Sequence, residues 1–506
     1  MHGVDLCIDK RFIQKEAVDD RVFGAFVEHM NNTVYHGLYA PGHPMANRDG
    51  FRQDVIDLVR PLRLSLIRYP GGNFACSYRW EDTVGPADRR PVRADLAWRQ
   101  LEPNRVGLSE FAKWAGAVGS PLALTVNLST RSAVDAANLV EYCNFPGGTY
   151  WSDLRRRHGD EQPFDIRLWF LGNEVDGPWN IGRKRAEQYA WDAVEAAKAM
   201  RRIDSGIELV AVGSSGTQLD TYLSWDQTVL ESIYDCCEYL SLHRYGALPD
   251  TDTPDSYDCG DTGAYLALAD RLERNIQDVN AVCDYVRGKK RRSKTMCLSV
   301  DEYNALDAGP TPDLQEAPLP WQVGPSLHTP GLSMRGTLLF ALYMLTLLRH
   351  ADRVKIACQS ILINGAGLVI CEKDQDAWVN GSYYVFLHCS LYGRGRVLNA
   401  VWRDPQAAFP LADSICIYHE RTRELVVFAV NKRSEPVSLH VETAYFGTLR
   451  LLERLEMASA DPYARNSAQH QKTLNPVARQ DVTITDQDIR CELAGYSWNV
   501  IRLKER

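Results

Sequence analysis

The 506-residue sequence predicts an α/β protein, a (β/α)8 TIM barrel with a C-terminal all-β domain. Apolar, β-branched-rich segments recur along the first three quarters of the chain, and segments with a 3.6-residue apolar period lie between them. After about Val379 the helical period stops and short strand patterns follow. Eight successive βα units favour a closed barrel, and a doubly wound sheet is the alternative.

Each barrel element is expected from its own segment. The expected strands are Arg21–Glu28, Leu64–Arg68, Leu122–Asn127, Arg167–Leu171, Glu208–Gly213, Glu238–His243, Cys297–Asp301 and Lys355–Ile363. The expected helices include Phe51–Val59, Leu108–Val118, Ala133–Cys143, Arg185–Arg202, Ala264–Arg287 and Arg335–His350. Two stretches rich in Pro, Gly and Asp are expected to be loop insertions, Asp250–Thr262 and Ala305–Pro330.

The C-terminal part predicts a β-sandwich or jelly-roll-like domain without a helix of convincing length. Its expected strands include Ser414–Tyr418, Glu424–Asn431, Val437–Val441 and Trp498–Leu503. The expected division of the chain is a strand segment that packs on the β-domain (1–15, with Val4–Ile8 as the strand), the catalytic barrel (16–378) and the β-sandwich (379–506).

Composition narrows the function classes. The net charge of −8 and the pI near 5.9 argue against a nucleic-acid partner. The apolar run Gly336–Leu348 is too short to cross a bilayer, so no membrane partner is expected. The first residues lack the pattern of a signal peptide, and the 13 cysteines contain no CxxC pair. These observations predict a cytoplasmic protein with reduced thiols.

Polar residues follow nearly every predicted barrel strand. Because barrel active sites lie at the C-terminal ends of the strands, these side chains are expected to meet at one rim. They are Glu28, His29, Arg68, Asn73, Asn127, Asn173, Glu174, His243, Arg244, Tyr245, Asp301, Glu302, Gln359 and Asn364.

Glu174 and Glu302 follow the fourth and seventh predicted strands, which lie across the barrel mouth from each other. Glycoside hydrolysis needs such a pair, one carboxyl to protonate the leaving oxygen and one ionised to attack or to activate water. His243 and Tyr245 are placed to hydrogen-bond these carboxylates and to hold Glu302 ionised. An isolated Glu more often caps a helix, but two facing carboxylates with neighbouring Asn residues favour catalysis.

Other chemistries find less support. No HExxH helix, P-loop, GxSxG elbow or GxGxxG turn occurs in the expected context. The spacing of Glu28, His29, His36 and His43 matches no metal-ligand pattern, so no metal is expected. Trp179 falls in a rim loop where its ring can stack on a sugar, with core packing as the alternative.

At these motifs the sequence resembles glycoside hydrolase family 51, the α-L-arabinofuranosidases, and the likeness covers most of the barrel. The segments that carry the resemblance are Phe26–His29, Tyr39–Pro44, Arg68–Phe74, Trp80–Pro86, Asn138–Asn144, Leu171–Trp179, Ser241–Tyr245 and Asp301–Asn304.

The resemblance implies a retaining exo-glycosidase that removes terminal α-L-arabinofuranosyl groups from arabinose-containing oligosaccharides. Glu174 is then the acid/base and Glu302 the nucleophile. The furanose hydroxyls are bound by Glu28, Arg68, Asn73 and Asn173, with Tyr245 beside the nucleophile. Two carboxylates supply all the chemistry, so no cofactor is expected. The resemblance also implies a homo-oligomer.

Three departures from the family leave the specificity open. Tyr303 stands where Trp is frequent, and Ile361 stands where a substrate-binding Gln is usual. Gln359 lies two residues earlier and would share a strand face with Ile361. The loops after strands six and seven also differ. A β-D-galactofuranosidase, a β-xylosidase or an endo-glucanase is therefore an alternative, and a non-catalytic carbohydrate-binding protein is a more distant one.

Overall fold

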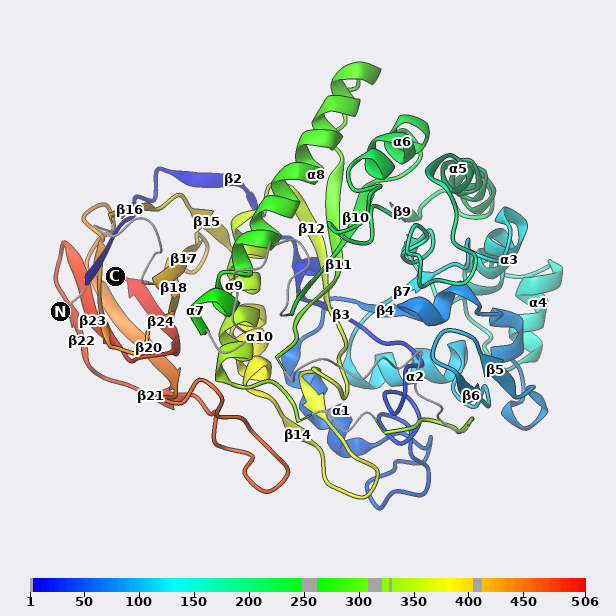
Figure 1. Ribbon diagram of the computed structural model, residues 1–506, viewed down its shortest axis with the longest axis horizontal. Coiled ribbons are helices and arrows are strands. Elements are labelled where there is room, and N and C mark those ends of the chain that lie inside the picture. Colours follow the sequence, from blue (N-terminus) through cyan, green and yellow to red (C-terminus); the bar gives the residue numbers. More distant parts are fainter. Residues whose placement is uncertain (1–2, 248–261, 308–320, 327–329, 404–411) are drawn as a thin grey trace.

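The computed structural model describes residues 3–247, 262–307, 321–326, 330–403 and 412–506. A closed barrel ringed by helices lies beside two β-sheets that contain both chain ends (Figure 1). The two expected insertions lie mostly outside the described residues. Among the described helices, none combines the length and apolarity needed to cross a bilayer.

Eight parallel strands close the barrel, which confirms the predicted fold class. In spatial order they run β3, β4, β7, β8, β9, β10, β11 and β12 and return to β3. Their bounds are Gly24–Phe26, Ile67–Tyr69, Leu122–Thr125, Leu168–Phe170, Glu208–Ala211, Tyr239–Gly246, Cys297–Ala305 and Val354–Gln359.

The first strand is shorter than its apolar pattern predicted. The Asp19 carboxylate accepts a hydrogen bond from the backbone N–H of Arg21, which caps a 3-10 turn, η1 (Asp20–Phe23). This local capping competes with strand pairing, as Asp side chains do. Strand β3 therefore begins only at Gly24.

Helices cover the barrel. They are α1 (Gln53–Val59), α2 (Leu108–Val118), α3 (Ala133–Asn144), α4 (Tyr150–Arg157), α5 (Ala186–Ile203), α6 (Ser224–Ile233), α7 (Thr262–Leu266), α8 (Ala269–Lys290), α9 (Met334–Arg349) and α10 (Gly381–Tyr392). The helix expected over Ala264–Arg287 is divided into α7 and α8. Helix α4 was not predicted because its Arg155 is buried, donating to the carbonyls of Tyr142 and Phe145, which no apolar period reveals.

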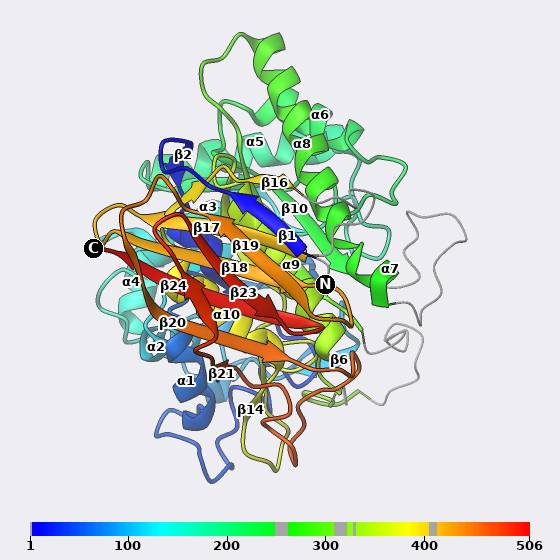
Figure 2. The same cartoon turned by 90° about the vertical axis from the view of Figure 1, so that its left-hand side faces the viewer.

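The two β-sheets form a sandwich (Figure 2). One has the order β16-β1-β19-β23-β22, with bounds Val401–Arg403, Gly3–Cys7, Val437–Glu442, Asp488–Leu493 and Val482–Ile484. The other has the order β2-β15-β17-β18-β24-β20-β21, with bounds Ile13–Ala17, Arg396–Leu398, Ala412–His419, Glu424–Asn431, Ser497–Glu505, Leu449–Ala458 and Val477–Ala478. Both N-terminal strands thus join sheets made otherwise from the C-terminal part of the chain. The chain divisions after residues 15 and 378 stay a prediction.

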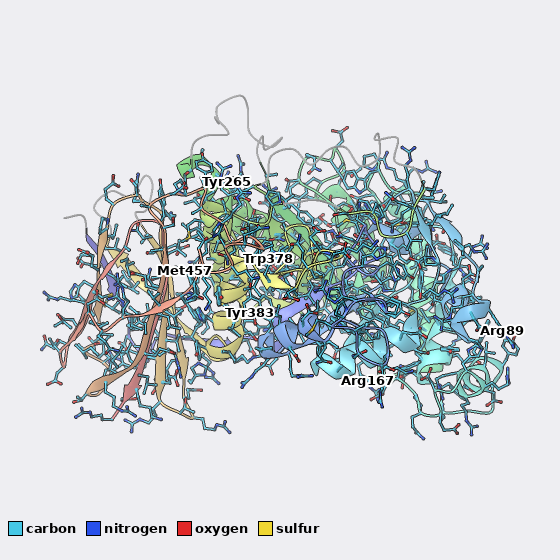
Figure 3. All side chains as sticks on the ribbon, turned by 90° about the horizontal axis from the view of Figure 1, so that it is seen from below. Arg89, Arg167, Tyr265, Trp378, Tyr383 and Met457 are labelled. Carbon is cyan, nitrogen blue, oxygen red and sulfur yellow. The ribbon has the colours of Figure 1, made fainter. Side chains whose placement is uncertain are left out.

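Strand β18 shows how the sandwich is attached to the barrel. Leu425 and Val427 pack in the core between the two sheets, whereas Val426 and Phe428 belong to the large core that includes α9 and the barrel helices. Successive side chains of a strand point to opposite faces of the sheet. A strand that is apolar on both faces is therefore expected to be buried on both. Figure 3 shows Met457 of β20 and Tyr383 of α10 near this junction.

Helix α9 lies between the seven-stranded sheet and the barrel strands β11 and β12. Its residues from Met334 to Leu348 are all buried, which explains the long apolar run. Helix α10 corrects the expectation that no helix follows Val379. It packs on α9, and Tyr383 donates to the carbonyl of Leu58 in α1, so it closes the ring of barrel helices. Burial on several sides leaves its sequence without an amphipathic period.

Candidate active site

Glu174 and Glu302 meet at the C-terminal end of the barrel. One carboxylate oxygen of each residue and a ring nitrogen of His243 all lie within 4.8 Å of one another. All three side chains are buried. Glu174 comes just after β8, His243 from β10 and Glu302 from β11, so the convergence results from barrel closure.

Two donors hold the Glu174 carboxyl. His243 Nδ1 lies 2.8 Å from Oε1, and Trp179 Nε1 donates to Oε2 at 2.7 Å. Burial raises the pKa of Glu174, and the hydrogen bond and charge of His243 oppose that rise. The backbone of Glu174 has φ 43°, a left-handed conformation that costs a non-glycine residue about 1–3 kcal/mol. The Asn180 side chain donates to its carbonyl at 2.7 Å and so helps to hold this turn.

The Glu302 carboxylate accepts hydrogen bonds from two side chains. Arg68 Nη1 donates to Oε1 at 2.9 Å, and Tyr245 donates to Oε2 at 2.8 Å. The Tyr245 hydroxyl also bonds to the hydroxyl of Ser360. A guanidinium and a phenol that donate to the two oxygens of a carboxylate fix its orientation by charge-assisted hydrogen bonds.

Arg68 connects Glu302 to the amide side chains of the site. Its Nη2 donates to Asn173 Oδ1 at 2.7 Å, and Asn173 Nδ2 donates to Asn73 Oδ1 at 3.2 Å. The guanidinium is fully buried and lies 4.9 Å above the ring of Phe170. Asn73 and Asn173 are therefore held in fixed orientations beside the two carboxyls.

Asp301, which the sequence analysis expected at the barrel rim without assigning it a role, is a member of this cluster. Its Oδ2 lies 3.5 Å from His243 Nε2 and 3.4 Å from Arg68 Nε. Burial disfavours the imidazolium, but Glu302, Asp301 and Glu174 outweigh it and raise the pKa of His243 well above its usual range. Burial likewise opposes the charge of Asp301, yet Arg68 and His243 lower its pKa.

A bulge explains why Asp301 and its neighbour Glu302 both reach this cluster. Ser299 of β11 pairs with Ser241 of β10, and Glu302 pairs with His243. Between these two pairs β11 therefore has one residue more than β10. The register of β11 against β12 shifts in the same region. Strict alternation would send adjacent side chains to opposite faces, and a bulge is the usual way to redirect one.

Glu28 is a further buried carboxyl residue of the expected site. Trp98 Nε1 donates to its Oε2 at 2.9 Å, and the backbone N–H of Phe74 donates to the same oxygen at 3.2 Å. Burial and then the nearby Glu302 raise the pKa of Glu28 well above its usual range. Gly72 has φ 60°, and any β-carbon there would overlap the Glu28 carboxyl, so glycine is required.

Trp98 is a site residue that the sequence analysis did not place. It lies between β5 (Arg93–Asp95) and β6 (Gln100–Glu102), a hairpin inserted after β4. The Asp95 carboxylate accepts the backbone N–H groups of Ala97 and Trp98 and so shapes the tip of the hairpin. Short strands in a long loop give little periodic signal, and the contact with Glu28 spans 70 residues.

Hydrogen bonds and ion pairs join eight of the ten expected site residues in one network. Glu28 is linked to it only by its electrostatic interaction with Glu302, and Gln359 is the exception. Gln359 is buried, and its amide nitrogen donates to the backbone carbonyl of Ile361 at 3.2 Å. Ile361 packs in the apolar cluster at the barrel centre with Phe26 and Met30. Within the described part of the chain, no hydrogen bond brings the Gln359 amide to the carboxyl of Glu174 or Glu302.

The cluster of Glu174, His243 and Glu302 also resembles a metal-binding set by proximity. Its chemistry fits a metal poorly, because Nδ1 of His243 is engaged with Glu174 and the raised pKa favours the imidazolium. A protonated imidazole has no lone pair for a cation. That the reaction needs no metal stays a prediction.

The comparisons with known proteins agree with this geometry. The model of the α-L-arabinofuranosidase 1 domain matches residues 58–259, and that of the α-L-arabinofuranosidase C-terminal domain matches residues 301–497. An intracellular exo-α-(1→5)-L-arabinofuranosidase of Halalkalibacterium halodurans is 42% identical over 99% of both chains. A relative of the same name, numbered 1, from Bacillus subtilis is 40% identical over 100% of both.

A solved structure supports the same assignment. It is a family 51 α-L-arabinofuranosidase from Bifidobacterium longum, with a TM-score of 0.92 and 32% identity over 99% of both chains. Fold, length and sequence similarity therefore extend over the whole chain rather than one domain. The chain belongs to the α-L-arabinofuranosidases of glycoside hydrolase family 51.

Proposed function

We propose that this enzyme is a retaining exo-α-L-arabinofuranosidase that releases terminal arabinofuranosyl groups from arabino-oligosaccharides. The observation that carries the proposal is the approach of Glu174 and Glu302, whose nearest oxygens lie within 4.8 Å. Retaining enzymes have carboxyl groups about 5–5.5 Å apart, whereas inverting enzymes leave about 6.5–9.5 Å for a water molecule.

In the first step, Glu302 attacks the anomeric carbon as the glycosidic bond breaks, and Glu174 gives its proton to the departing oxygen. The product is a glycosyl ester on Glu302. In the second step Glu174 takes a proton from water, the hydroxyl attacks the anomeric carbon, and the ester bond breaks. The raised pKa of Glu174 favours the acid form, and Arg68 and Tyr245 orient the Glu302 carboxyl through their hydrogen bonds.

Exo cleavage is supported by the polar side chains gathered beside the two carboxyls. Glu28, Asn73 and Asn173 offer acceptors and donors to the hydroxyls of a single sugar, and Trp98 donates a hydrogen bond to Glu28. The relatives from Halalkalibacterium halodurans and Bacillus subtilis are named exo-α-(1→5)-L-arabinofuranosidases. We extend that linkage to this chain, together with the intracellular location in their names. A homo-oligomer is the state expected in solution, which light scattering tests.

The other furanoside and pyranoside specificities are weaker candidates. Ile361 in the barrel centre is the reason to keep them as alternatives, because an apolar side chain cannot make the hydrogen bonds of the Gln that is usual in the family. The family assignment and the intact pair of carboxyls favour the arabinoside. The same two observations argue against a non-catalytic carbohydrate-binding protein.

The test is the stereochemistry of transfer. Hydrolysis of 4-nitrophenyl α-L-arabinofuranoside in the presence of methanol is followed by proton NMR. A double displacement yields methyl α-L-arabinofuranoside, and the β-anomer would refute retention. The matched β-D-galactofuranoside and β-D-xyloside measure specificity, and we expect the arabinoside to be clearly preferred.

A further inference from the structure

A polar cavity of about 780 Å³ lies among the loops that follow β4, β7 and β8. Its size falls in the range of about 300–1,000 Å³ that is usual for small-molecule sites. The side chains that matter for its chemistry are Arg79, Glu81, Leu96, Arg131, Asp135 and Ile181. None of them belongs to the cluster around Glu174 and Glu302.

The cavity adjoins the active site at three points of its wall. Phe74, which lines it, donates its backbone N–H to Glu28. Leu96 lies two residues before Trp98, whose indole contacts Glu28. Ile181 lies two residues after Trp179, whose indole contacts Glu174. The cavity wall thus includes one residue that binds a site carboxyl and two that lie close in sequence to such residues.

The point near Ile181 and Trp179 is on the leaving-group side of the reaction. Glu174 is the proposed proton donor to the departing oxygen, so the rest of the substrate must extend past Glu174 and Trp179. The loop continues from Trp179 to Gly182, which packs against the backbone of Ser129 so closely that a β-carbon would overlap it. This contact fixes Ile181, 43% exposed, in the cavity wall.

Charges in the wall are largely compensated. Arg131 donates to Glu81 at 2.6 and 2.7 Å and to Asp135 at 2.6 Å. Paired charges of this kind present both donors and acceptors at fixed positions and carry little net charge. Sugar hydroxyls, which donate and accept at once, match such a surface.

Two further features suit a sugar. Leu96 and Ile181 are 53% and 43% exposed and offer apolar surface to the C–H face of a ring. The guanidinium of Arg79 is exposed and, within the described residues, makes no ion pair with a carboxylate. Its donors are available to hydroxyl and ring oxygens.

We propose that this cavity binds the second and third sugar residues of an uncharged arabino-oligosaccharide, on the leaving-group side of the cleaved bond. The inference rests on the proposed function and deepens it by predicting a preference for chains over small aglycones. Binding energy gained there by a long substrate is available to the reaction at the scissile bond.

The test compares two substrates across two variants. Arg79→Ala removes the exposed donor, and Ile181→Asn removes the apolar wall. kcat/KM is measured with 4-nitrophenyl α-L-arabinofuranoside and with linear α-(1→5)-linked arabinotriose. Each variant is expected to lower kcat/KM for the triose about 5- to 10-fold, the effect of one lost contact, and to leave the aryl substrate within about twofold of wild type.

Arg105→Ala is the matched control, because Arg105 is an exposed arginine that lines a separate cavity beside Tyr35 and Tyr39. It is expected to change neither substrate. Unchanged triose hydrolysis in both variants would overturn the inference, and so would equal losses on the two substrates. Inactivity of the wild type toward both substrates would instead refute the proposed function, and the inference with it.

Discussion

Nδ1 of His243 lies 2.8 Å from Oε1 of Glu174, although the strands that carry them are separated in the barrel by β9. On its other side the same imidazole faces Asp301 at 3.5 Å. One ring therefore connects the proposed acid/base to the strand of the proposed nucleophile. Any change at His243 should affect the ionisation of Glu174.

We expect His243→Asn to move the alkaline limb of the pH profile of kcat/KM to higher pH. Burial raises the pKa of Glu174 and His243 lowers it, so loss of the imidazolium leaves burial less opposed. The acid form then persists to higher pH. Activity at the optimum should fall about 10- to 100-fold because Glu174 loses a positioning contact.

The control is His350→Asn, which removes a histidine that lies 2.8 Å from Glu273, away from the site. It should leave the pH profile of kcat/KM unchanged. An alkaline limb of His243→Asn that moves to lower pH would contradict the relation between His243 and Glu174.

Glu174→Ala should discriminate between leaving groups. A nitrophenolate departs without protonation, so its ester-forming step should slow little. An alkyl or sugar leaving group needs the proton, and its kcat/KM should fall about 10²- to 10⁴-fold. The measurement is kcat/KM over a series of aglycones of increasing pKa. Equal losses on all of them would remove Glu174 from the acid/base role.

Glu302→Ala should lower kcat by about 10³-fold or more on every substrate, since the attacking atom is gone. Azide fits the space left by a carboxylate and can attack the anomeric carbon in its place. A β-configured glycosyl azide, detected by NMR, is the expected product with an activated α-substrate. An α-azide would show that another residue of the enzyme is the nucleophile.

Arg68→Met should destabilise the fold by about 3–5 kcal/mol, because it removes one of the two buried cations that face Glu302 and Asp301, the other being His243. The folded-state pKa of Asp301 is lowered, despite burial, by Arg68 and His243. That contribution to stability is present above the unfolded-state pKa and is lost as pH falls through the folded-state pKa. The difference between wild type and variant in urea unfolding should therefore shrink in acid.

Arg52→Met is the control for activity, because Arg52 is equally buried and pairs with Asp54 outside the site. It should cost stability while the folded enzyme keeps its kcat. A difference between Arg68→Met and wild type that grows in acid would contradict the role given to Arg68.

The sequence alone determined the features that depend on local and repeating patterns. Periodic apolar segments predicted all eight barrel strands, and the position of Glu174 and Glu302 after strands four and seven predicted their meeting, since barrel closure brings strand ends together. Strand β18 was predicted with its observed bounds because its two apolar faces make one continuous run.

Tertiary structure decided what depends on contacts between distant segments. Helix α10 has no amphipathic stripe, because it packs on α9, Tyr383 contacts α1, and His388 contacts Trp498 of β24. Trp98 reaches Glu28 only through the fold of an inserted hairpin. The bulge in β11 brings Asp301 beside Glu302 against the alternation of a strand. Periodicity reports one buried face at a time, so residues placed by several packed neighbours or by a local register shift leave no periodic trace in the chain.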